Sequence, residues 1–129
     1  MFTIDQIKAA HLKVKSGSDF PAYIRDLKQL GVISYETLVK DGQTIYAGSN
    51  HFQATAQPKY ALLHIAEEAD SNQFISDLKA HQQGKTDYPT FCADCAKSGV
   101  EKWAVSLEKM TCTYYDKKGN ELIKEQIPS

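Results

Sequence analysis

The sequence predicts an α+β fold in which two helices and a three-stranded antiparallel meander occur twice in one chain. The stretch over residues 18–39, SDFPAYIRDLKQLGVISYETLV, is matched without a gap 68 residues later by TDYPTFCADCAKSGVEKWAVSL. In each copy the apolar residues recur first at the spacing of a helix and then at that of a strand. We interpret the match as an internal duplication, with halves at about residues 3–57 and 70–128.

The matched positions include those that start and stop a helix. Average residue usage would give about one or two identities over such a stretch, whereas this one has five. They are Asp19, Pro21, Asp26, Gly31 and Val32, which recur as Asp87, Pro89, Asp94, Gly99 and Val100.

Two helices are predicted before the first strand. Thr3 can cap the first, whose apolar stripe comprises Ile4, Ile7, Ala10 or His11, and Val14, and which ends at residues 15–17. The second is capped by Ser18 or Asp19, carries Pro21 in its first turn, and stops at Gly31. Its buried face is predicted to hold Phe20, Tyr23, Ile24, Leu27 and Leu30.

Strands are predicted where apolar residues begin to recur at every second position. Residues 33–39 form the first, and Asp41-Gly42 predicts a two-residue hairpin that leads into residues 43–47. A third strand is expected at residues 51–55. The pattern at residues 60–66 fits either a fourth strand or a short helix.

The second half repeats this plan. One helix runs from Asp70 or Ser71 to Gly84, and the next, capped at Thr86 or Asp87, ends at Gly99. The second of these directs Tyr88, Phe91, Cys92, Cys95 and Ala96 inward. Strands are expected at residues 102–108, 111–115 and 122–127. Each half is expected to bury its sheet face and helix stripes against the other half.

Composition limits the class of protein. A chain of 129 residues that is 42% apolar predicts one core and one domain, residues 1–129. A net charge of -1 disfavours general nucleic-acid binding. The sequence lacks a signal-peptide pattern and any apolar run of the roughly 18 residues that span a membrane. Three cysteines, an odd number, fit a reducing compartment, so we expect a cytoplasmic location. The expected oligomeric state is a monomer or a homodimer.

A cysteine pair is the one metal-like pattern. Cys92 and Cys95, with Cys112 and His81 as further ligands, have the residue types of a zinc site. The pair falls inside a predicted helix, however, and aligns with Ile24 and Leu27, which are predicted core positions. We therefore expect the cysteines to pack in the core, and we expect no cofactor.

The run HQQGKTDY is the polar stretch most suited to contact a partner. Its candidate ligand-binding residues are His81, Gln82, Lys85 and Tyr88, and the alternative interpretation is a helix end followed by a cap. His81 aligns with Lys13, which predicts an outward or boundary position. Its Gly-Lys-Thr lacks the earlier glycine and the preceding strand of a phosphate loop.

Aromatic residues on the strands give a second candidate. If the halves face one another, some of these rings line a groove at the junction; otherwise they are core. They are Tyr35, Tyr46, Trp103, Tyr114 and Tyr115, of which Trp103 and Tyr114 are the candidate binding residues.

The runs HQQGKTDYPTFCADCAKSGVEKW and MTCTYYDKKGNE resemble the YbcV-like family of uncharacterised bacterial proteins, some of whose members are labelled phage envelope protein. The resemblance covers essentially the whole chain and implies a bacterial domain of unknown function, with a prophage connection for some members. It supplies no catalytic residues. We therefore predict a non-catalytic module that binds an unknown small molecule or protein. The alternative is a small enzyme or a metal or thiol protein that uses His81, Cys92, Cys95 and Cys112.

Overall fold

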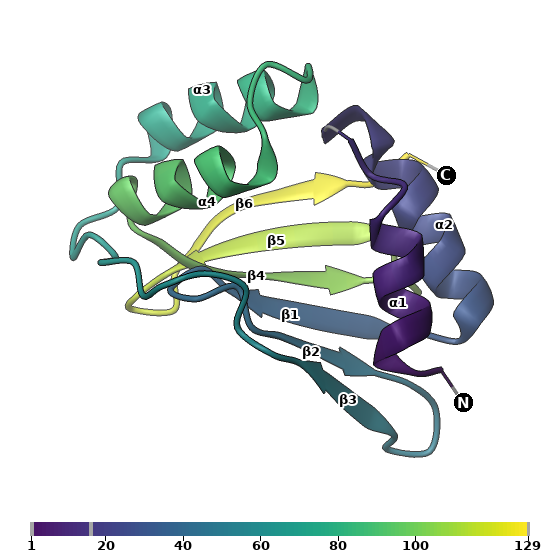
Figure 1. Cartoon of the computed structure of the whole chain (residues 1–129). Helices are drawn as coiled ribbons and strands as arrows, with labels where there is room; N and C mark the ends of the chain where they lie inside the picture. Colours follow the sequence, from purple (N-terminus) through teal and green to yellow (C-terminus); the bar gives the residue numbers. More distant parts are fainter. Residues whose placement is uncertain (1, 16, 129) are drawn as a thin grey trace.

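The computed structural model describes residues 2–15 and 17–128, in which helices and strands alternate as two helices, three strands, two helices and three strands (Figure 1). The helices are α1 (Ile4–His11), α2 (Phe20–Leu30), α3 (Ser71–Gln82) and α4 (Tyr88–Lys97), with a 3-10 turn η1 (Gly17–Asp19) before α2. The strands are β1 (Ser34–Leu38), β2 (Thr44–Ala47), β3 (Gln53–Ala56), β4 (Val100–Ser106), β5 (Thr111–Asp116) and β6 (Glu121–Gln126). The predicted α+β class is confirmed.

Capping residues start three of the helices as predicted. Thr3 accepts a hydrogen bond from the Gln6 amide in a capping box, and the carboxylates of Asp70 and Asp87 accept from the third residue after each. Asp19 takes the N-cap position of α2 without a side-chain capping bond, and its carboxylate accepts from the Lys15 amide instead. Gly31 ends α2 in the left-handed region, with φ of 100°.

The strands form one antiparallel sheet in the order β3-β2-β1-β4-β5-β6. The first strands of the two halves, β1 and β4, are neighbours at its centre, and Glu36 pairs there with Ala104. These two residues are also equivalent in the sequence match, which is the pairing expected if a twofold axis relates two copies. The duplication itself stays a prediction.

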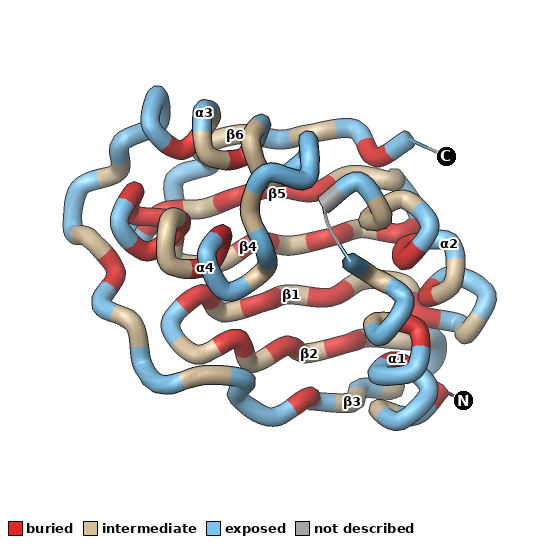
Figure 2. Tube along the Cα trace, turned by 45° about the horizontal axis from the view of Figure 1, so that its top comes forward, coloured by how far each residue is buried: buried red, intermediate tan, exposed pale blue. Residues whose placement is uncertain are grey.

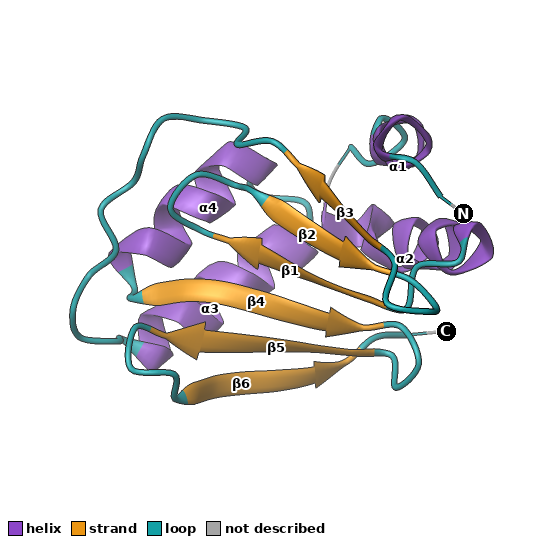
Figure 3. Ribbon diagram, turned by 90° about the horizontal axis from the view of Figure 1, so that it is seen from below, coloured by secondary structure: helices purple, strands orange, loops and turns teal. Residues whose placement is uncertain are grey.

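All four helices cover the same face of the sheet (Figures 1 and 3). Strand residues on that face are buried, such as Tyr35, Thr37 and Trp103, whereas alternate residues on the other face are half-exposed (Figure 2). On the uncovered face Lys102 forms an ion pair with Glu36 at 2.9 Å.

The two halves lie edge to edge rather than face to face, so the expectation that the sheet face of one half is buried against the other half is wrong. Each helix pair instead contacts strands of its own half. Tyr23 of α2 contacts Tyr46 of β2, and Phe74 of α3 contacts Tyr114 of β5 with ring centroids 4.9 Å apart. The shared sheet joins both sets of contacts in one core.

Several predicted boundaries need correction. Helix α1 ends at His11, because the Lys13 and Val14 amides bond three residues back and tighten the chain into a turn. Ser16, part of the predicted stop, lies outside the described residues. A five-residue loop, 39–43, replaces the two-residue hairpin, and the third strand begins at Gln53 rather than at residue 51.

Residues 60–66 form neither a strand nor a helix. Their polar groups bond to two separate parts of the fold: the Tyr60 hydroxyl and the Leu63 amide reach the backbone oxygens of residues 39 and 40, and the Ala66 amide reaches Ala96. Acceptors in separate parts of the fold thus satisfy hydrogen-bonding groups of this segment without the regular hydrogen-bond ladder of a strand. In the part of the chain that is described, no helix has the length and apolarity to cross a bilayer.

Candidate functional site

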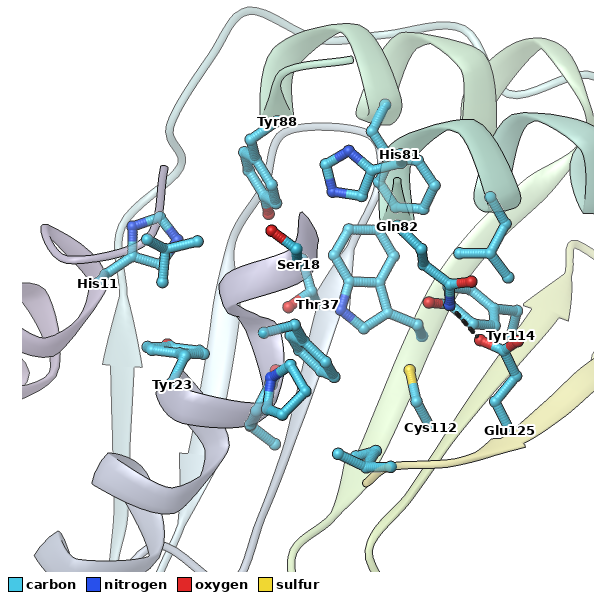
Figure 4. A pocket seen from close by; sticks show the side chains of 18 of the residues that line it. His11, Ser18, Tyr23, Thr37, His81, Gln82, Tyr88, Cys112, Tyr114 and Glu125 are labelled. Atoms are coloured by element: carbon cyan, nitrogen blue, oxygen red, sulfur yellow. Dashed lines mark hydrogen bonds between the residues drawn. The ribbon is translucent and has the colours of Figure 1, made fainter. Parts of the chain in front are cut away.

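A cavity of about 460 Å³ lies on the helix-covered face, between the two helix pairs (Figure 4). Its walls come from α1, α2, α3, α4 and the strands beneath them. Aromatic side chains dominate the lining: Phe20, Tyr23, Tyr35, Tyr46, Tyr88, Phe91, Trp103 and Tyr114. A hollow of this size and composition is typical of small-molecule sites.

Hydroxyl groups gather at the side of the cavity formed by the first half. The Tyr23 and Tyr46 hydroxyls are 3.3 Å apart, and the Oγ1 atoms of Thr37 and Thr44 are 3.0 Å apart. Burial raises the pKa of both tyrosines, so their hydroxyls stay protonated. His11 packs edge-on against Tyr23, at 5.3 Å between ring centroids.

Larger rings gather at the side formed by the second half. Trp103 lies 5.8 Å from Phe91, 6.1 Å from Tyr114 and 6.3 Å from Tyr88, measured between ring centroids. These are ordinary separations for packed aromatic pairs. Rings held by one another in this way present fixed faces and edges to the cavity.

His81 is stacked on Phe91, with centroids 4.3 Å apart and planes 9° apart. Its Nδ1 lies 3.1 Å from the Thr86 carbonyl oxygen, which can only accept, so Nδ1 carries the proton and donates. Burial lowers the pKa of His81, although that bond and the nearby Asp87 oppose the shift. The neutral ring therefore keeps Nε2 as an acceptor.

The charges around the cavity are uneven. Lys15, Lys59 and the two histidines line it, whereas Glu125 is the only acid among the described lining residues. The Gln82 amide donates to the Glu125 carboxylate at 2.8 Å. Glu125 lies on the edge strand β6, and Lys59 follows the opposite edge strand β3. Glu125 and Lys59 are thus at opposite ends of the cavity.

Five of the six sequence-predicted binding residues line this cavity: His81, Gln82, Tyr88, Trp103 and Tyr114. Lys85 does not, because it lies exposed in the α3–α4 connection. Tyr35 and Tyr46 also line it, but Tyr115, after the irregularity in β5, contacts Lys102 instead.

Sequence reasoning found Tyr35 and Tyr46 of the first half but missed the contribution of its helices and of residue Lys59 to this site. His11 was recognised only as an alternative position on an apolar stripe, and Tyr23 only as a buried residue of α2. The available signal for this part of the site was a histidine on the apolar stripe of the first helix together with a tyrosine on the buried face of the second. Lys59 had none, because its side chain reaches the cavity from an irregular segment.

The three cysteines are free and buried, as expected for core residues. Among residues 2–15 and 17–128, no three His, Cys, Asp or Glu side chains come together as a metal site would require. Burial raises the pKa of Cys112 to about 12, although its hydrogen bond with Tyr114 opposes the shift. A reactive thiol needs a lowered pKa, so the metal or thiol alternative gains no support.

Fold and site together define a class of protein, an α+β chain with an aromatic-lined cavity between two helix pairs on one antiparallel sheet. The family model described as Protein of unknown function (DUF1398) matches residues 8–126, and the chain belongs to that family.

Curated relatives match a shorter stretch. The chain is 37% identical over 46 residues to uncharacterized protein Mb2035 of Mycobacterium bovis and to uncharacterized proteins MT2067 and Rv2012 of Mycobacterium tuberculosis. The match covers 36% of this chain and 28% of each relative. These names supply no function, and the resemblance to the YbcV-like family and its phage label stays a prediction.

Proposed function

We propose that this chain is a non-catalytic binding module and that its cavity holds a small organic molecule with a planar ring. One observation carries the proposal: the cavity of about 460 Å³ is walled largely by aromatic side chains from both halves. Ligand sites commonly measure about 300–1,000 Å³ and combine an apolar wall with a few convergent polar groups.

The polar groups in the wall favour a bound molecule over simple core packing. The Tyr23, Tyr46, Thr37 and Thr44 hydroxyls offer donors and acceptors at one end, and Trp103 offers a ring for stacking at the other. In the Tyr23–Tyr46 pair only one hydroxyl donates to the other, so one phenolic proton is left for a bound molecule to accept.

Binding rather than catalysis is favoured by the state of the candidate reactive groups. Burial raises the pKa of the Cys92 thiol despite its hydrogen bonds with Tyr60 and Tyr88. A nucleophilic thiol requires the opposite shift, a lowered pKa.

Several finer expectations belong to the same proposal. We propose one domain over residues 1–129, a cytoplasmic location and a monomer or homodimer, and three free thiols agree with a reducing compartment. A prophage connection rests on the family resemblance alone. Size-exclusion chromatography tests the oligomeric state, because a large assembly would contradict it.

Trp103 makes the binding proposal directly testable, because it is the single tryptophan of the chain. A metabolite library is screened by thermal shift, and each hit is then titrated while Trp103 fluorescence is followed. We expect saturable hits among compounds with planar rings, since a ligand at 100 times its Kd adds about 2.7 kcal/mol of stability.

Two variants serve as controls. Cys112→Leu fills part of the cavity and should weaken every genuine hit, whereas Leu62→Ser, at an exposed position away from the lining residues, should leave the hits unchanged. Hits that bind Cys112→Leu as tightly as the natural chain, or a library without hits, would contradict the proposal.

A further inference from the structure

We propose that the ligand is an aromatic acid, a planar ring system carrying one carboxylate, whose carboxylate lies between His11 and Lys59. This inference rests on the proposed function, since it names the chemical class that the same cavity takes. It follows from how charge is distributed around the walls.

Two basic side chains meet at the first-half end of the cavity. The Lys59 ammonium lies 5.6 Å from the centroid of the Tyr88 ring, and His11 lies 5.9 Å from the same ring on its edge. The positive charge of Lys59 is also felt at His11, where it adds to burial in lowering the pKa of the imidazole. Both groups therefore flank Tyr88 at one end of the site.

In the part of the chain that the structure describes, neither basic group forms an ion pair with an acid. A second hollow next to the cavity shares His11, Tyr46 and Lys59 with it and adds Lys8, and its described lining contains no acid. The wall between the two hollows thus carries uncompensated positive charge that would favour an anion.

The far end of the cavity does not compete for that anion. Glu125 lies there, next to Tyr114 rather than His11, as Figure 4 shows. Its carboxylate already accepts from Gln82. A carboxylate ligand would be repelled by Glu125 and attracted by Lys59, which fixes the direction in which it enters.

Tyr88 links the charged end to the aromatic end. The centroid of its ring lies 5.9 Å from that of His11 and 6.3 Å from that of Trp103. A flat molecule that lies along Tyr88 therefore has its acid group beside the two basic side chains and its ring beside Trp103. The tyrosine hydroxyls nearby can donate to the same carboxylate.

Three probes of nearly equal shape test the charge preference: 2-naphthoate, 2-naphthylmethanol and 2-naphthylmethylamine. Each is titrated at pH 7.5 and low salt against the full chain while Trp103 fluorescence is followed. We expect the acid to bind at least tenfold more tightly than the alcohol and the amine to bind most weakly. The advantage of the acid should shrink as salt is added, because the interaction is partly exposed.

Matched variants assign the effect to the proposed group. Lys59→Gln should reduce the affinity for 2-naphthoate about tenfold and leave the alcohol unchanged. Lys85→Gln removes an equal charge outside the cavity and should change neither. Lys59 is exposed, so its replacement is not expected to disturb the fold.

Each contrary result is decisive. If the alcohol binds as tightly as the acid, or if Lys59→Gln weakens both equally, the inference is overturned while a binding cavity still stands. If none of the three probes binds, the inference is overturned as well, and the wider metabolite screen then decides the proposed function separately.

Discussion

Replacing Cys112 by leucine should stabilise this protein, although cysteine is fully buried there. Cys112 is 3% exposed on β5, and its sulfur points into the cavity (Figure 4). Leucine places two methyl groups beyond the position of the sulfur. At about 0.8 kcal/mol for each buried carbon, the gain is at most about 1.6 kcal/mol. Ordering the leucine side chain costs about 0.5–1 kcal/mol, and the weak hydrogen bond between Cys112 and Tyr114 is lost, which leaves at most about 1 kcal/mol of added stability.

Cys95 provides the matched control. It is 0% exposed on α4 and does not line the cavity, so no adjacent space can receive a larger side chain. The same substitution there should cost about 1–3 kcal/mol, because overpacking forces neighbouring side chains out of their preferred rotamers. One chemical change is thus expected to have opposite signs at two buried cysteines.

Urea denaturation followed by circular dichroism measures both variants without relying on Trp103, which lies close to Cys112. A shift in the midpoint at constant slope reports the change in the free energy of unfolding. Similar destabilisation by Cys112→Leu and Cys95→Leu would refute the reasoning, because it would mean that the space beside Cys112 is already filled.

Three further predictions concern the backbone, the thiols and pH. Gly119→Ala should lower the free energy of unfolding by about 1 kcal/mol, because Gly119 has a φ of +82° and open space around it. Gly99→Ala should lower it clearly more, because the new Cβ would lie 2.8 Å from the backbone of residues 68 and 69. Equal losses of stability in urea denaturation would contradict that contact. A disulfide reagent should modify the native thiols slowly and all three rapidly in guanidinium, because they are buried and the pKa of Cys112 is about 12; rapid native reaction would disprove their burial. Burial and the charge of Lys59 lower the pKa of His11 below 6.5, so protonation at lower pH adds positive charge beside an anion. Affinity for 2-naphthoate should therefore rise from pH 8 to pH 5 in fluorescence titrations and rise less in His11→Gln, and an equal rise in both would rule out His11.

The helices were predictable because their signals are local. Asp70, Asp87 and Gly31 act through bonds or backbone angles within one turn of the chain, and the structure places each of them at the expected helix end. Asp19 was less predictable, since η1 precedes α2 and the Asp19 carboxylate bonds to the Lys15 amide. The Lys15 amide lies before the helix, so a pattern of capping residues does not predict this hydrogen bond.

The arrangement of the halves was not predictable from apolar patterns. Such patterns show that a face is buried but not what covers it. They therefore could not decide whether two meanders stack or join at β1 and β4. The irregular course of residues 60–66 has a similar cause, because its acceptors lie on residues distant in sequence.

The candidate site was predictable from its second half. Residues between His81 and Tyr88 lie in one polar run, and Trp103 and Tyr114 lie on inward strand positions. Lys85 belongs to that run but does not line the cavity, because it lies exposed in the connection between α3 and α4. His11 and Lys59 reach the same cavity from distant segments that no single motif joins.

Nuclear magnetic resonance of the ¹⁵N-labelled chain with 2-naphthoate tests the central claim most directly, because one indole N–H signal reports Trp103 alone. We predict that this signal and the amide of His11 shift together and saturate at one equivalent of ligand. The amides of Glu36 and Lys102, on the uncovered face, should stay in place. An unmoved Trp103 signal, or shifts confined to the uncovered face, would contradict a ligand cavity between the two helix pairs.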